Sequence, residues 1–62
     1  MNAAQITALF AALLTGSKIE VGAIYGVPMK IERESGTSGN LTGLNVCLFV
    51  GTGTRCVYVK LA

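Results

Sequence analysis

Residues 4–14 constrain the fold more than any other part of the chain, because they are the only segment whose apolar residues have helical spacing. These apolar residues follow the positions i, i+3, i+4, i+7 and i+8 of an amphipathic helix: Ile6, Leu9, Phe10, Leu13 and Leu14. Asn2 is suited to cap the beginning of this helix, and Gly16 suits the left-handed position that ends it. The residues that follow are strand-like, so we expect the helix to cover one face of a sheet.

The opposite side of the predicted helix carries no charge. Ala4, Ala8, Ala11 and Thr15 recur on it, and no charged side chain precedes Lys18. A solvated helix face usually carries charged and polar residues, whereas small side chains allow a second backbone to approach closely. We therefore expect Ala4, Ala8 and Ala11 to belong to an interface.

The chain is short for its apolar content, which favours self-association. Its 62 residues are enough for a single domain, residues 1–62, and a chain of this size buries only roughly 60% of its unfolded surface. Hydrophobic residues make up 52% of the chain and charged residues 13%, which excludes a disordered protein. Scaffolds this small are commonly stabilised by disulfides, metals or oligomerisation. We expect a homo-oligomer, either a dimer or a dimer-based assembly.

The same counts argue against several classes of function. A formal charge of +2 is too small to indicate a nucleic-acid partner, and two Cys without any His leave too few ligands for a zinc site. The apolar run over residues 3–14 is shorter than the roughly 20 residues of a membrane span, and no Lys or Arg precedes it as in an export signal. We expect no cofactor, no metal and no membrane partner. The predicted location is cytoplasmic, in the host cytoplasm if the protein is viral.

Four segments after the helix alternate as β-strands do: residues 18–21, 29–34, 44–50 and 55–61. In the second of them, Met29 and Ile31 are expected to point inward. Glycine-containing links join the segments, and links this short favour an antiparallel meander. The predicted fold class is α+β, with one N-terminal helix packed on a four-stranded antiparallel meander sheet.

The two C-terminal strands are apolar on both faces. The face expected under the helix carries Leu44, Val46, Leu48, Val50, Val57, Val59 and Leu61. The other face carries Asn45, Cys47, Phe49, Cys56, Tyr58 and Lys60, and so differs from the polar outer face of a one-layer sheet. The predicted core consists of Leu9, Leu13, Val46, Leu48, Val57 and Val59. Cys47, Phe49 and Tyr58 are assigned to the interface together with the helix alanines.

Cys47 and Cys56 lie on this second face. A two-residue turn at Gly51 and Thr52 places them directly opposite each other, so that a cross-strand disulfide is geometrically possible. A four-residue turn makes them diagonal neighbours. Because we find no export signal, we expect reduced thiols that pack as small hydrophobic side chains. The chain has no His to serve as a base for a nucleophilic thiol.

Acid–base catalysis has equally little support. The carboxylates alternate with cations, as in solvated cross-strand pairs: Glu20, Glu32 and Glu34 among Lys18, Lys30 and Arg33. No set of catalytic residues emerges, and we predict that the protein is not an enzyme.

Two groups of polar residues are candidates for binding a small anionic ligand. Cations beside Phe49 and Tyr58 would resemble the surface with which sheet proteins bind single strands, but Glu20 and Glu32 dilute the positive field. An apolar patch against a second copy is therefore favoured. The loop over residues 35–43 lacks the Gly-Lys-Ser/Thr sequence of a phosphate loop and is interpreted as a connection, although loops often carry binding residues. The candidate ligand residues are Lys18, Lys30, Arg33, Thr37, Ser38 and Lys60.

Together these observations predict a non-enzymatic, homo-oligomeric binding protein that acts stoichiometrically. No motif identifies a family. The chain is similar in size to phage-encoded accessory proteins that inhibit a host factor or sequester a small, nucleotide-like anion, which is an analogy of size alone. The alternatives are a sheet that binds single-stranded nucleic acid and a structural subunit of a viral assembly. The expected partners are a second copy, and a host protein or a small anionic ligand.

Overall fold

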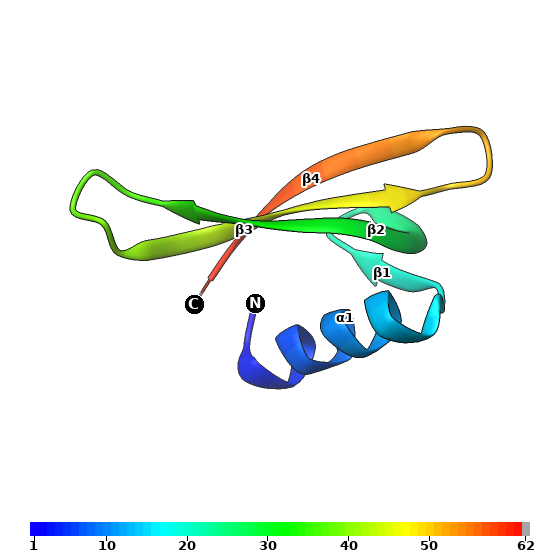
Figure 1. The fold of residues 1–62 in the computed structure, drawn as a ribbon, viewed down its shortest axis with the longest axis horizontal. Coiled ribbons are helices and arrows are strands. Elements are labelled where there is room, and N and C mark those ends of the chain that lie inside the picture. The colour runs from blue at the N-terminus through cyan, green and yellow to red at the C-terminus, as the bar shows by residue number, and fades with distance from the viewer. Residues whose placement is uncertain (62) are drawn as a thin grey trace.

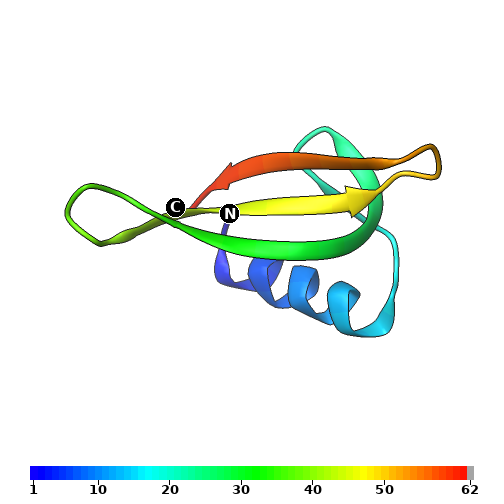
Figure 2. The same cartoon turned by 45° about the horizontal axis from the view of Figure 1, so that its top comes forward.

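One helix and four strands make up the fold, as the computed structural model of residues 1–61 shows (Figure 1). In chain order they are α1 (Ala3–Thr15), β1 (Ile19–Val21), β2 (Ile24–Ser35), β3 (Leu41–Phe49) and β4 (Thr54–Lys60). The strands form a single antiparallel sheet in the order β1-β2-β3-β4, and α1 lies on one side of it (Figures 1 and 2). This arrangement confirms the predicted α+β fold with an N-terminal helix and a four-stranded meander.

The ends of α1 follow from the residues that flank it. The side chain of Asn2 accepts a hydrogen bond from the backbone N–H of Gln5, and the side chain of Gln5 accepts one from the backbone N–H of Asn2. This reciprocal capping box satisfies two of the donors that a helix start leaves without a partner. Gly16 has a φ of 69°, and its N–H donates to the carbonyl of Ala12, so the helix closes at a left-handed residue.

The reversal between β1 and β2 is tighter than expected from the predicted strands at residues 18–21 and 29–34. The link between β1 and β2 is a turn at Gly22 and Ala23, and the strand resumes at Ile24. Gly22 makes this turn with a φ of 60°, a conformation that residues with a side chain rarely adopt. Gly26 falls in the link between the predicted strands 18–21 and 29–34, but it is buried within β2, where a Cβ would collide with the carbonyl group of Phe49.

The core lies between α1 and the face of the sheet that the helix covers. Its buried apolar residues are Leu9, Ala12, Val21, Leu44, Val46 and Leu48. The predicted burial of Leu9, Val46 and Leu48 is confirmed, whereas Leu13, Val57 and Val59 are half-buried. Val57 and Val59 lie on β4, the last strand of the sheet, and the β1–β2 turn curls over this face, where a Cβ on Gly22 would lie 3.3 Å from the Val57 side chain. Val21 thereby takes part of the space that we expected the helix to fill.

Three predicted inward positions are exposed: Phe10, which is 43% exposed, Leu14 and Met29. Leu14 is 86% exposed, because the buried side of α1 is centred on Leu9 and Ala12 and leaves the last turn outside. Met29 is 59% exposed, because the register of β2 against β3 shifts between Pro28 and Lys30. Such a shift is a β-bulge, which turns the extra residue out of the alternation. Ile31, beyond the bulge, packs against the core as predicted.

Replacing Leu48 by Ala should lower the free energy of unfolding by about 2–5 kcal/mol, the usual cost of truncating a buried leucine. Leu14→Ala is the matched control: it makes the same chemical change at an exposed position and should cost less than about 0.5 kcal/mol. Urea denaturation of both variants measures the difference. Equal costs would show that Leu48 does not occupy the core.

Candidate binding surface

The face of the sheet opposite α1 is the candidate binding surface, and we call it the outer face. It is built from residues that alternate with the core positions: Lys30, Glu32 and Glu34 of β2, Gly43, Asn45, Cys47 and Phe49 of β3, and Thr54, Cys56, Tyr58 and Lys60 of β4. No helix covers it among the described residues (Figure 2). Phe49 is 45% exposed and Tyr58 is 49% exposed, so this face presents aromatic surface to solvent.

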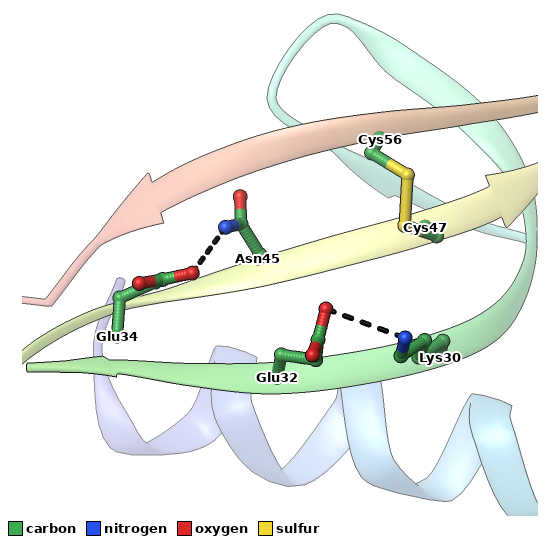
Figure 3. The surroundings of a disulfide bond; sticks show 6 residues. All are labelled: Lys30, Glu32, Glu34, Asn45, Cys47 and Cys56. Carbon is green, nitrogen blue, oxygen red and sulfur yellow. Dashed lines mark hydrogen bonds and ion pairs between the residues drawn. A yellow bond between two sulfur atoms is a disulfide. The ribbon is translucent and has the colours of Figure 1, made fainter.

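A disulfide between Cys47 and Cys56 lies in the middle of the outer face (Figure 3). The expectation of two reduced thiols is therefore wrong. The hairpin turns through two residues, since the N–H of Val50 donates to the carbonyl of Gly53, and this register sets the two cysteines directly opposite each other. Their Cα atoms are 3.9 Å apart. Opposed residues that do not exchange backbone hydrogen bonds approach most closely in an antiparallel pair, which brings the sulfur atoms within bonding reach.

Tyr58 is held against the sheet rather than projecting freely from it. Its ring lies over Gly43, where a Cβ would approach the ring atoms to about 2.5 Å. The Tyr58 hydroxyl lies 3.5 Å from Oγ1 of Thr42. The Thr42 hydroxyl in turn donates to the backbone carbonyl of Glu34. An aromatic ring over a strand glycine replaces the packing that the glycine lacks. Tyr58 thus contributes a fixed apolar plane to the outer face.

The polar groups on the β2 side of the outer face are paired with each other. Nζ of Lys30 lies 3.5 Å from a carboxylate oxygen of Glu32, and the side-chain amide of Asn45 donates to the carboxylate of Glu34 (Figure 3). Both members of the Lys30–Glu32 pair are more than half exposed, so the pair adds little stability. Its effect is to neutralise Lys30 locally, and this weakens an anion site there.

The candidate ligand residues are spread over the molecule. Thr37 and Ser38 lie at the tip of the β2–β3 hairpin, and Lys18 lies in the link between α1 and β1, at the other end of the fold (Figure 1). Arg33 is paired with Leu44, whose side chain belongs to the core, so the register places Arg33 on the helix side of the sheet. Lys60 is at the end of β4. The structure does not gather these residues into one site.

A small hollow does bring Lys18 close to aromatic side chains. It has a volume of about 360 Å³ and is lined by Lys18, Tyr25, Gly26, Val27, Phe49, Val50 and Gly51. Tyr25 is 61% exposed and belongs to none of the sites predicted from the sequence. Its exposure could have been predicted from strand alternation if the second strand had been expected to begin at Ile24 rather than at Met29. The hollow combines one cation with two aromatic rings.

The predicted interface residues fall on two separate sides of the molecule. Ala4, Ala8 and Ala11 are exposed on α1, whereas Cys47, Phe49 and Tyr58 belong to the outer face. Ala8 also lines a shallow hollow between the helix and β1. A single two-fold contact can use only one of these sides. The assignment of these residues to an interface stays a prediction.

No helix among the described residues is long and apolar enough to cross a membrane. Within the same residues, no group of three or more His, Cys, Asp or Glu side chains is placed to hold a metal ion. Comparison of the chain with family models, with curated proteins and with solved structures finds no match. The arrangement of the outer face is therefore the basis for a functional proposal.

Thiol counting on denatured, unreduced protein should find no free thiol, because both cysteines are linked. Replacing both by Ser should lower the free energy of unfolding by about 2–4 kcal/mol, since the bond restricts the unfolded chain. Denaturation with and without a reducing agent supplies a second measure of the same effect on the native sequence. Two free thiols in protein purified without reductant would contradict the disulfide.

Proposed function

We propose that this protein is a non-enzymatic binding protein that acts stoichiometrically and works as a homo-oligomer. The observation that carries the proposal is the outer face, where exposed aromatic rings flank a disulfide on a sheet whose other side already forms the core. Exposed apolar patches on small proteins mark interaction sites more often than they mark neutral surface. The distribution of charge agrees with this role, because the centre of an interface is usually depleted of charged residues.

The small core supports self-association. The buried hydrophobic core of residues 1–61 consists of six residues, while the exposed large apolar residues are Phe10, Leu14, Tyr25, Met29, Leu41, Phe49 and Tyr58. A domain of this size has little stability to spare, and burial of part of this surface against a second copy would add to it. A second copy is therefore the first partner that we propose.

A further partner would be a host protein or a small anionic ligand, as expected for a phage-type accessory protein. The hollow beside Lys18 supports the second possibility, since Tyr25 and Phe49 offer ring faces next to the cation. The outer face as a whole gives less support for nucleic acid, because Glu32 and Glu34 offset its cations. A binding affinity that falls steeply with salt concentration would favour a nucleic-acid partner. An affinity that does not depend on salt would favour an apolar partner.

A cytoplasmic location stays part of the proposal, and the disulfide weighs against it. Cytoplasmic thiols are usually kept reduced, whereas disulfides persist in oxidising compartments. The thiol content of protein that is alkylated at the moment of cell lysis would decide between the two locations.

The oligomeric state is the sharpest test of the proposal. The wild type should have a mass in solution of at least twice the 6.4 kDa of one chain, measured by light scattering at two concentrations. Phe49→Lys places like charges near the contact if the outer face is used, and Ala8→Glu does the same for the helix. One of the two should lower the mass of the assembly. Thr52→Lys, in the exposed β3–β4 turn, is the control for added charge and should leave the mass unchanged.

A folded wild-type monomer at roughly tens of micromolar would contradict the homo-oligomer, since obligate assemblies lose their fold as they dissociate. Unchanged mass in both charge variants would instead show that neither predicted side forms the contact.

A further inference from the structure

Strand β4 has one edge that no other strand of residues 1–61 covers, since β4 is last in the sheet order. The hydrogen bonds at its two ends show which residues face this edge. The carbonyl of Gly53 accepts from Val50 at 2.9 Å, and the N–H of Leu61 donates to Thr42 at 3.0 Å. Because residues in an antiparallel pair alternate, Arg55, Val57 and Val59 also bond to β3. The N–H and carbonyl groups of Thr54, Cys56, Tyr58 and Lys60 therefore point away from β3, toward the open edge.

The contact of Met1 with β4 agrees with this alternation. The backbone amine of Met1 donates to the carbonyl of Lys60 at 2.8 Å, which requires that carbonyl to face outward. This contact occupies the last position of the edge. The described residues provide no hydrogen bond to the outward-facing backbone groups of Cys56 and Tyr58. The middle of the edge is thus available for pairing.

The opposite edge of the sheet, formed by β1 and the rest of β2, is protected against pairing in ways that the β4 edge is not. Strand β1 has only three residues, and beyond it β2 carries Pro28, two shifts of register against β3, and a run of charged residues. Bulges, proline and charge are the usual means by which proteins prevent edge-to-edge association. Strand β4 has seven residues in continuous register, with charges only at Arg55 and Lys60, near its ends.

We propose that β4 pairs antiparallel with β4 of a second copy, about a two-fold axis through Val57. Thr54–Lys60 is centred on Val57, so this register aligns the two strands over their full length, and the bonds between copies come from Cys56 and Tyr58 because Met1 already bonds to the carbonyl of Lys60. Cys56 then faces Tyr58 of the second copy, and these two residues have their backbone groups directed at the edge, as a hydrogen-bonded pair requires. A two-fold axis between two residues of β4 would place each residue whose N–H and carbonyl face the edge opposite a residue of the second copy whose N–H and carbonyl already bond to β3.

A second copy fits this edge because the strand is complementary to itself in this register. Arg55 lies opposite Val59 of the second copy, and Lys60 lies opposite Thr54, so no like charges face each other. An axis at Arg55 would bring the two arginines together, which is unfavourable. The pairing rests on the homo-oligomer proposed above and specifies how two of its copies meet.

Edge pairing joins the two sheets into one and leaves both helices on the same side. The two-fold axis of an antiparallel strand pair is perpendicular to the sheet, so the outer faces also become continuous. The aromatic surface around Phe49 and Tyr58 is thereby doubled rather than buried. It remains available for a partner or for a contact between dimers, and this contact is the one that Phe49→Lys tests.

Amide hydrogen exchange resolves the edge residue by residue. In an open edge, Val57 and Val59 are protected by β3 while Cys56 and Tyr58 exchange quickly. In the proposed dimer all four amides are protected, and those of Cys56 and Tyr58 should slow by at least about tenfold from dilute to concentrated samples. The same measurement on Phe49→Lys should give the same pattern, because the edge does not include Phe49.

A synthetic chain with an N-methyl group on the backbone nitrogen of Tyr58 provides the matching perturbation. It removes one edge-facing donor while keeping the side chain and the bonds to β3, and it should halve the mass of the Phe49→Lys assembly. N-methylation of Thr52, in the turn, is the control and should leave that mass unchanged.

The outcomes separate this inference from the proposed function. An oligomer whose Cys56 and Tyr58 amides exchange quickly at every concentration overturns the edge pairing and leaves the homo-oligomer intact. A monomer at every concentration overturns both. An oligomer with protected amides whose mass is unchanged by N-methylation of Tyr58 also overturns the pairing, because the protection then has another source.

Discussion

The burial of three side chains from the central strand β3 is the interaction on which the rest of the structure depends. Leu44, Val46 and Leu48 are among the few buried residues, and the other elements are arranged around them. The helix contributes Leu9 to this cluster and β1 contributes Val21, while Ala12 is buried on the same side of the helix. A core with so few members can cover only one face of a sheet. Residues 1–61 therefore leave the outer face of the sheet exposed.

The two-residue turn between β3 and β4 determines the chemistry of that outer face. It fixes the register in which Cys47 meets Cys56, and the same register lets the ring of Tyr58 reach Gly43. It also sets which backbone groups of β4 bond to β3 and which face the open edge. The disulfide then links the two strands covalently beside this edge. One local turn thus sets both the shape of the outer face and the regularity of the edge strand.

The sequence was sufficient for the fold because its local signals agree with one another. The cap at Asn2, the left-handed Gly16 and the alternation in the C-terminal strands all depend on short-range chemistry. The errors arise where contacts distant in sequence decide the outcome. Met29 is turned outward by a bulge, and Ala12 is buried because of how the helix lies on the curled sheet. No periodicity within either segment contains that information.

The cysteines show how a correct geometric alternative can be set aside for a contextual reason. A two-residue turn predicts their direct opposition, whereas the predicted cytoplasmic location favours free thiols. The structure shows that register decides the matter, because opposed cysteines in this kind of pair lie close enough to bond wherever the surroundings are oxidising.

Charge placement separates the two sides of the molecule and gives a physical reason for association at β4. Strand β2 carries four consecutive or nearly consecutive charged residues, Lys30, Glu32, Arg33 and Glu34. They lie near the edge of the sheet where β2 also has its two shifts of register. Charged side chains and bulges on an edge strand disfavour pairing with another strand. The middle of β4 offers neutral residues and unpaired backbone groups, so pairing there carries a smaller cost. Residues 1–61, which leave the outer face exposed, thus also retain one edge at which a second copy can extend the sheet.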